Sequence, residues 1–67
     1  MTFARFKAVI GGFIAKAGIS MDVRFSHDIE RGRFSARFSD GTVITGHPSG
    51  RKITVRYGSG HQMMIAV

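Results

Sequence analysis

The sequence predicts an α+β fold, in which an N-terminal amphipathic helix packs on a five-stranded antiparallel sheet or on a small, partly closed barrel. Three observations lead to this fold class. Large apolar residues recur at helical spacing over the first 17 residues. From residue 20 onward apolar and polar residues alternate, as in half-buried strands. Glycine-containing turns separate the alternating stretches. With 67 residues and no visible linker, the chain is expected to be a single domain, residues 1–67.

The helix is predicted from its apolar stripe. Steps of three and four residues place five side chains on one face: Phe3, Phe6, Ile10, Phe13 and Ala17. Thr2 is the expected N-cap, and Gly18 stands where a left-handed residue ends many helices. Ile19 is then expected to fold back on Ile14. The Gly11–Gly12 pair has low helix propensity, so tertiary packing must stabilise the helix.

Five strands are predicted from the two-residue period, at residues 21–26, 33–39, 42–47, 52–57 and 62–67. Asp40 and Gly41 indicate a two-residue hairpin, because such a turn needs positive φ at both central positions. This turn pairs Phe38 with Val43 on the core face. Every phenylalanine except Phe3 is expected to face the core.

The last predicted strand is apolar on both faces. Met63, Ile65 and Val67 alternate with Met64 and Ala66. Two interpretations remain open. The strand is either central or covered on both sides, or it forms a subunit interface through Met63, Met64 and Ile65, since exposed apolar edges promote association.

The order of one helix followed by five short strands resembles that of Sm-like and SH3-like small barrels. The resemblance concerns architecture. It implies a strongly curved sheet and carries no expectation about function.

The charge balance indicates an acidic partner. Ten Lys and Arg residues stand against four Asp and Glu, giving a net charge of +6, and seven of the ten cations are Arg. The planar guanidinium group binds phosphate and carboxylate oxygens in a bidentate manner. The chain has no cysteine, which favours a reducing compartment, and a cytoplasmic location is expected.

The cations are expected to gather at one end of the sheet. In an up-and-down meander the loops at 27–32 and 47–50 share an end, and a helix antiparallel to the first strand brings its N-terminus there. The residues expected at this end are Arg31, Arg33, Arg51 and Lys52, with His27, His47, Arg5 and Lys7. The solvent face adds Arg24, Arg37 and Arg56, between Ser and Thr hydroxyls that also donate to phosphate oxygens.

These features predict a nucleic-acid-binding module that contacts the phosphate backbone of a duplex or of structured RNA. Without exposed aromatic rings it would lack a platform for stacking unpaired bases. The alternative is a small protein-binding inhibitor or adaptor, of the kind encoded by phages and mobile elements, that blocks an acidic or nucleic-acid-handling host complex. Self-association is compatible with either. Membrane binding is not expected, because the polar face of the helix carries few cations.

No catalytic or metal centre is expected. The three histidines, His27, His47 and His61, are isolated in sequence and no cysteine accompanies them. Asp28 and Glu30 share a solvated turn, without the apolar surroundings that a pair of catalytic carboxyls needs. The sequence therefore predicts a protein that is not an enzyme and has no cofactor.

The N-terminus allows a second interpretation as a signal peptide. Cations precede an apolar stretch at 8–15, and Ala15-Lys16-Ala17 has the small-residue pattern of a cleavage site. The Gly11–Gly12 pair interrupts the apolar stretch, and cleavage would leave about fifty residues, too few to bury an adequate core. A folded helix is therefore the preferred interpretation.

Overall fold

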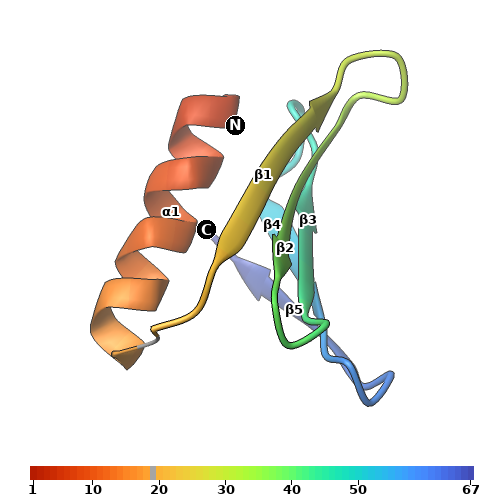
Figure 1. The fold of residues 1–67 in the computed structure, drawn as a ribbon. Coiled ribbons are helices and arrows are strands. Elements are labelled where there is room, and N and C mark those ends of the chain that lie inside the picture. Colours follow the sequence, from red (N-terminus) through yellow and green to blue (C-terminus); the bar gives the residue numbers. More distant parts are fainter. Residues whose placement is uncertain (19) are drawn as a thin grey trace.

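The computed structural model describes residues 1–18 and 20–67, which form one helix and five strands (Figure 1). The elements are α1 (Phe3–Ala17), β1 (Val23–Asp28), β2 (Arg33–Phe38), β3 (Val43–Gly46), β4 (Lys52–Arg56) and β5 (Gln62–Ala66). Helix α1 covers one face of an antiparallel sheet and leaves the other face open. The predicted α+β class is confirmed. The first strand begins two residues later than predicted, at Val23.

The sheet is an up-and-down meander, as predicted. The strand order is β1-β2-β3-β4-β5, and each neighbouring pair is antiparallel. A barrel closes only where its two outermost strands pair. Here β1 and β5 are the two separate edges of the sheet and do not pair with each other. The sheet is therefore open, and the alternative of a partly closed barrel is wrong. The expected order of one helix followed by five strands, on which the resemblance to Sm-like and SH3-like barrels is based, is present.

Both predicted ends of α1 are confirmed. Thr2 is extended, with φ −85° and ψ 162°, and its hydroxyl oxygen accepts from the Arg5 backbone N–H at 3.0 Å. Gly18 has φ +67° and donates its N–H to the Ala15 carbonyl oxygen at 3.3 Å. The expected contact of Ile19 with Ile14 lies outside the described residues.

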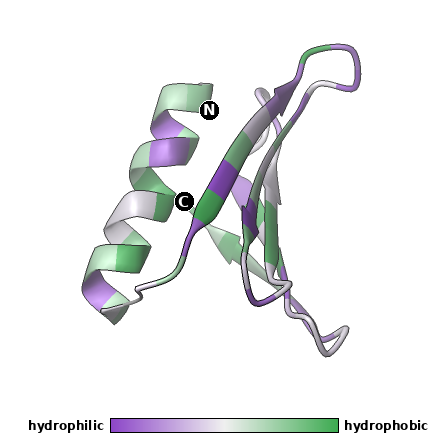
Figure 2. Ribbon diagram, viewed as in Figure 1, coloured by the Kyte–Doolittle hydropathy of each residue, from purple (hydrophilic) through white to green (hydrophobic). Residues whose placement is uncertain are grey.

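The core lies between α1 and the covered face of the sheet. Helix residues Phe6 and Ile10 are fully buried. The strands contribute Phe34, Ala36, Phe38, Ile44, Ile53 and Val55. Figure 2 shows the underlying alternation of apolar and polar residues most clearly along β1. Gly46 makes room for the helix, because a Cβ atom there would lie 3.1 Å from Cδ1 of Phe6. The Phe6 ring therefore packs directly on the bare backbone of β3.

The turn between β2 and β3 differs from the predicted two-residue hairpin. The Gly41 N–H donates to the Phe38 carbonyl at 3.1 Å, and the Phe38 N–H donates to the Thr42 carbonyl at 2.8 Å. Among the described residues positive φ occurs only at glycines, here at Gly41 with φ +93°. The loop thus has three residues, Ser39, Asp40 and Gly41, and places a single left-handed residue at its end.

This extra residue changes the register of β3. The predicted pair of Phe38 and Val43 is wrong, because Val43 lies opposite Arg37 and Ile44 lies opposite Ala36. A shift of one residue exchanges the two faces of a strand. Ile44 therefore enters the core, and Val43 faces away from α1.

The expectation that every phenylalanine except Phe3 faces the core is wrong for Phe13. Its side chain is 47% exposed, whereas Phe3 is half-buried and lies 5.4 Å, ring centre to ring centre, from Phe34. Helix α1 packs chiefly against β2, and its C-terminal turns diverge from the sheet (Figure 1). Phe13 therefore lies over a gap rather than within the core.

Strand β5 is an edge strand, so its interpretation as a central or doubly covered strand is wrong. Its neighbour on one side is β4, and the other side has no strand in the described parts of the chain. Met64 is 66% exposed. The subunit interface that Met63, Met64 and Ile65 were expected to form stays a prediction. In the described residues, no helix has the length and apolarity needed to cross a membrane.

Candidate nucleic-acid interface

The face of the sheet that α1 leaves uncovered is called here the outer face. Strand register places one residue from each strand in a row across it, consisting of Arg24, Arg37, Val43, Arg56 and Gln62. Arg24 lies directly opposite Arg37, and Arg56 lies between Val43 and Gln62. Three of the seven predicted contact residues are thus brought into one line.

A second row runs beside the first and is formed mainly by hydroxyl side chains. Its members are Ser26, Ser35, Thr45, Thr54 and Met64. The hydroxyl oxygens of Ser26 and Ser35 are 2.6 Å apart and share a hydrogen bond. Alternation along the strands also puts Arg33 and Lys52 on the outer face. Hydroxyl and guanidinium donors therefore lie side by side over β1 to β4.

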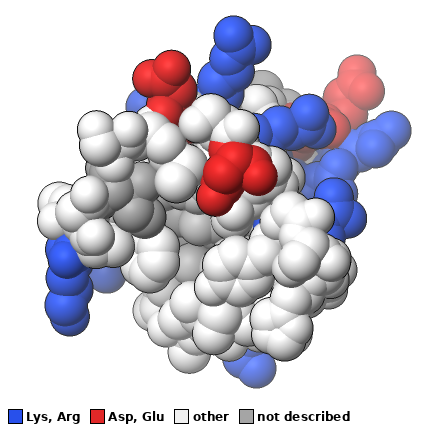
Figure 3. Space-filling model, turned by 60° about the horizontal axis from the view of Figure 1, so that its bottom comes forward, with Lys and Arg blue, Asp and Glu red and all other residues white. Residues whose placement is uncertain are grey.

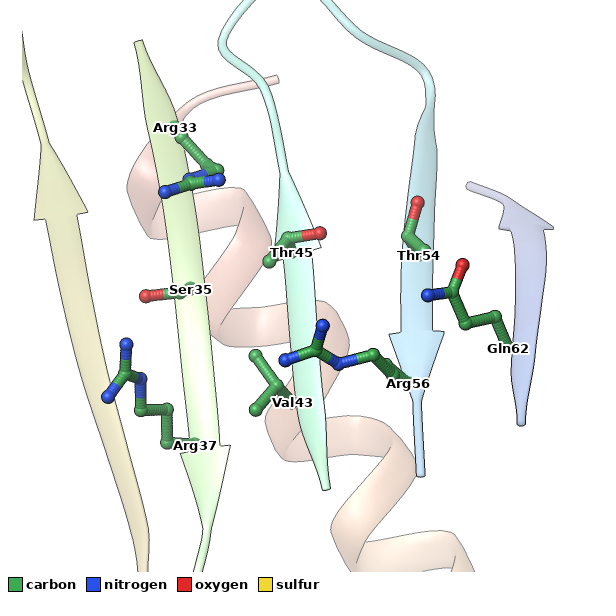
Figure 4. A pocket seen from close by; sticks show the side chains of 8 residues that line it. All are labelled: Arg33, Ser35, Arg37, Val43, Thr45, Thr54, Arg56 and Gln62. Atoms are coloured by element: carbon green, nitrogen blue, oxygen red, sulfur yellow. The ribbon is translucent and has the colours of Figure 1, made fainter. Parts of the chain in front are cut away.

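The two rows border a shallow hollow of about 280 Å³ over β2, β3 and β4 (Figure 4). Arg33 and Arg37 border it from β2, near opposite ends, with the Arg37 guanidinium turned toward β1, and Arg56 extends over it from β4. The Arg56 side chain extends over β3 beside Val43, and Thr45 lies between the cations. The residues that line the hollow include three arginines and no carboxylate.

None of the described outer-face arginines forms an ion pair, although Asp28 lies opposite Arg33 in the strand register. Within residues 1–18 and 20–67 the one ion pair joins Arg31 Nε to Asp28 Oδ2 at 3.7 Å, in the loop between β1 and β2. The Arg31 backbone N–H also donates to the Asp28 carboxylate, at 3.1 Å. Like charges opposite each other on neighbouring strands destabilise a sheet. An anion bound between Arg24 and Arg37 would relieve this repulsion.

The two loops predicted to share one end of the sheet are in contact. The His47 ring nitrogen Nδ1 lies 3.0 Å from the Gly32 carbonyl oxygen, in a hydrogen bond between the loops. The Met1 nitrogen donates to the Pro48 carbonyl oxygen at 2.6 Å, so the N-terminus of α1 lies at this end as well. The predicted arrangement of loops and helix is confirmed.

The cations at this end nevertheless divide between different surfaces. Arg33 and Lys52 belong to the outer face, while Arg31 is held by Asp28. Arg51 lines a separate open hollow together with Arg5. The four strongest candidates therefore do not form one cluster, because the strand pleat sends neighbouring residues to opposite faces.

His27 and Lys7 are also placed away from the outer face. His27 lies in β1 rather than in the loop, and its ring centre is 4.7 Å from that of Phe34 and 5.2 Å from that of Phe3. The Lys7 ammonium lies 5.2 Å from the centre of the Phe3 ring, in a cation–π contact. Both side chains support the packing of α1 on the sheet.

The opposite end of the sheet has a different character. Figure 3 brings this end forward and shows a broad uncharged surface, with acidic groups beside it and Lys and Arg mostly at its rim. Here the Thr42 backbone N–H donates to Asp40 Oδ1 at 2.9 Å, and this bond, with a further bond from the Thr42 side chain, lowers the pKa of the Asp40 carboxyl. A permanent carboxylate at this end disfavours phosphate binding there.

Sequence reasoning missed three residues of the outer face: Val43, Thr45 and Gln62. The predicted two-residue turn placed Val43, and with it Thr45, on the core side. The three-residue loop ending at Gly41 reverses this assignment. Gln62 joins the site only through its pairing with Arg56, which follows from the length of the β4–β5 turn.

The outer-face rows contain no aromatic ring, and Tyr57 instead lies at the far end, stacked on His61 at 6.2 Å. In the described parts of the chain no group of three or more His, Cys, Asp or Glu side chains converges as metal ligands would.

Comparison of the chain with models of protein families, with curated proteins and with solved structures gave no match.

Proposed function

We propose that this protein binds duplex nucleic acid through its phosphate backbone, using the outer face of the sheet. The observation that carries the proposal is the row of Arg24, Arg37 and Arg56, which lacks acidic partners and runs beside a row of hydroxyl groups. Phosphate oxygens accept hydrogen bonds from both kinds of donor. A charged surface that served solubility alone would not need to oppose like charges across neighbouring strands.

The spacing of the row suits a duplex. Neighbouring strands lie about 4.8 Å apart, so Arg24 and Arg56, three strands apart, are separated by roughly 14 Å. This is comparable with the width of the major groove of B-form DNA, about 12 Å. Guanidinium groups at the two ends of the row would reach phosphates on both sides of a groove, with little contact to the bases.

The nature of the outer face argues against single strands as the preferred ligand. Proteins that hold unpaired bases stack them on aromatic rings. The hollow is lined by Arg, Ser, Thr and Gln side chains and by Val43, and none of these side chains is aromatic. Binding is therefore proposed to depend on the backbone and to show little sequence preference.

Fluorescence anisotropy with duplex DNA, duplex RNA and single strands over a range of salt concentrations tests the proposal. The five outer-face cations are Arg24, Arg33, Arg37, Lys52 and Arg56. If each contacts one phosphate, the logarithm of the affinity for duplex DNA should fall with the logarithm of the salt concentration with a slope of about −4 to −5. Duplexes should bind more tightly than single strands of the same length.

A matched pair of double variants locates the site. Arg37→Gln with Arg56→Gln and Arg5→Gln with Lys16→Gln both lower the net charge from +6 to +4, the first on the outer face and the second on α1. Only the first should weaken binding substantially and flatten the salt slope by about 1.8. Equal losses would assign the affinity to net charge. Absence of binding at physiological salt would contradict the proposal and favour an acidic protein surface as partner.

A further inference from the structure

The outer edge of β5 exposes unpaired backbone groups. On its inner edge, the Val67 N–H donates to the Arg51 carbonyl at 2.9 Å, and the Tyr57 N–H donates to the His61 carbonyl at 2.8 Å. Hydrogen-bonded positions alternate along an antiparallel pair. The backbone N–H and C=O groups of Met63 and Ile65 therefore point toward β4, as those of Val67 do. The N–H and C=O groups of the intervening residues, Gln62, Met64 and Ala66, point away from the sheet.

This edge lacks the features that usually prevent strands from associating. Natural proteins protect edges with charged residues, proline or bulges. The segment from Gln62 to Val67 has no charged residue and no proline, and all five β5 residues pair with β4 in unbroken register. The other edge strand, β1, carries Arg24, His27 and Asp28. The two edges of the sheet therefore differ in their capacity to pair.

Both faces of β5 are apolar and incompletely covered. Met64 on the outer face is 66% exposed, while Met63 and Val67 on the inner face are 43% and 45% exposed. On the inner side, a gap of about 90 Å³ lies between α1 and the strands, lined by apolar residues that include Phe13 and Ile65. An occupant of this edge should itself be an apolar strand.

We propose that β5 pairs with β5 of a second copy of this chain, antiparallel, about a twofold axis at Met64. In this register Met64 faces its own counterpart, Met63 faces Ile65, and Gln62 faces Ala66. The outward backbone groups of Gln62, Met64 and Ala66 then all fall at hydrogen-bonded positions. The inner-face pairs are apolar on both sides.

Charge favours a second copy over an acidic partner at this edge. Two copies that each carry +6 repel one another where their cations approach, so contact between them is least opposed at a surface without charge. Strand β5 is such a surface. An acidic partner would find no cation in β5 to pair with. The pairing joins the two sheets and sets their outer faces side by side, but it does not depend on nucleic-acid binding.

Sedimentation of the full chain over a range of concentrations, without nucleic acid, tests the association. The mass should rise to twice the 7.3 kDa of one chain. Met64→Pro removes an N–H that points away from β4, and edge strands tolerate proline there. Met64→Lys places two cations at the axis. Both variants should remain monomeric, and Met64→Leu should dimerise as the wild type does.

Two results would overturn the proposal. One is a wild-type mass of 7.3 kDa at every concentration at which the chain is soluble. The other is a dimer that forms equally well in Met64→Lys. Circular dichroism confirms that each variant is folded, and Met64→Lys keeps the test decisive if Met64→Pro unfolds.

The register is tested separately by single cysteines, because the chain has none of its own. Two residues facing each other at a hydrogen-bonded site have Cα atoms about 5.5 Å apart, within the range of about 4.4 to 6.8 Å that a disulfide spans. Met64→Cys should therefore form a covalent dimer on mild oxidation. Gln62→Cys should not, since its counterpart would lie four residues along the strand. Equal cross-linking of both variants would contradict the twofold axis at Met64.

Discussion

Arg24 and Arg37 lie directly opposite each other on the outer face of the sheet, and neither forms an ion pair within the described residues. Cross-strand like charges cost stability. An uncharged Ser or Thr at either position would fit the strand equally well and would avoid this repulsion. An anion bound between the two guanidinium groups would reduce this repulsion.

This relationship predicts a conflict between stability and binding. Arg37→Thr removes the repulsion, so the free energy of unfolding should rise by roughly 0.2–1 kcal/mol at low salt. The gain should shrink as salt screens the charges. Affinity for duplex nucleic acid should fall in the same variant. Urea unfolding and anisotropy measure the two effects.

Arg31→Thr is the control for this experiment, because Arg31 contacts Asp28 instead of another cation. It should leave stability unchanged or slightly lower it, since exposed ion pairs contribute about 0–1 kcal/mol. A loss of stability in Arg37→Thr at low salt would show that the side chain supports the sheet by packing and that repulsion is secondary.

Much of the fold could be predicted because it depends on local signals. The ends of α1 follow from Thr2 and Gly18, whose roles are set by their own side chains and backbone preferences. The strands follow from alternation, and tight turns make a meander the simplest topology. That topology in turn located the end of the sheet where His47 meets Gly32.

The register of β3 could not be predicted from the same signals. An Asp-Gly pair is compatible with a two-residue turn and with a longer loop in which Gly41 alone is left-handed. The one-residue difference moved Val43 from the predicted core to the candidate site. The exposure of Phe13 depends on how α1 crosses the sheet, and an apolar stripe does not specify a crossing angle. Closure of the sheet likewise depends on accumulated twist.

Gly41→Ala is predicted to destabilise the protein. A φ of +93° is strained for any residue with a Cβ, although the space beside it is adequate, with the nearest atom, Cα of Gly58, at 3.6 Å. The expected cost is about 1–3 kcal/mol, measured by urea or thermal unfolding. A change below about 0.5 kcal/mol, the scatter of ordinary surface substitutions, would contradict the positive φ of this turn.

Gly46→Ala is predicted to destabilise the core by a different mechanism. The added methyl group would lie 3.1 and 3.3 Å from Cδ1 and Cε1 of Phe6, a ring that is fully buried. Overpacking of this kind costs about 1–3 kcal/mol. Phe6→Leu in the same chain should remove part of that penalty. The two single variants and the double variant form a thermodynamic cycle, and strict additivity would show that Gly46 and Phe6 do not compete for space.

The helical glycines give the opposite prediction. Gly11 and Gly12 lie in the interior of α1, and a Cβ at either position would meet no atom within 4 Å apart from the adjacent backbone of the helix itself. Each substitution by Ala should raise the free energy of unfolding by about 1 kcal/mol. Thermal unfolding of the two single variants and the double variant measures the gain. A loss of stability would mean that another surface packs closely against this side of α1.

Lowering the pH should reveal how much the Asp40 carboxylate contributes to the stability of the folded protein. The Thr42 backbone N–H lowers the pKa of this carboxyl in the folded protein, whereas in the unfolded chain the pKa is ordinary, about 3.9. The unfolded state therefore binds the proton more readily. The stabilisation is fully present above the ordinary value and is lost as the pH falls through the lowered one.

Asp40→Asn isolates this effect, because Asn offers an oxygen to the Thr42 N–H but does not titrate. The wild type should be the more stable of the two at neutral pH, and the difference between their thermal midpoints should narrow as the pH falls below the ordinary carboxyl pKa of about 3.9. Titration elsewhere in the chain is common to both proteins and cancels in the comparison. A difference that stays constant with pH would show that the charge of Asp40 does not strengthen its bond to Thr42.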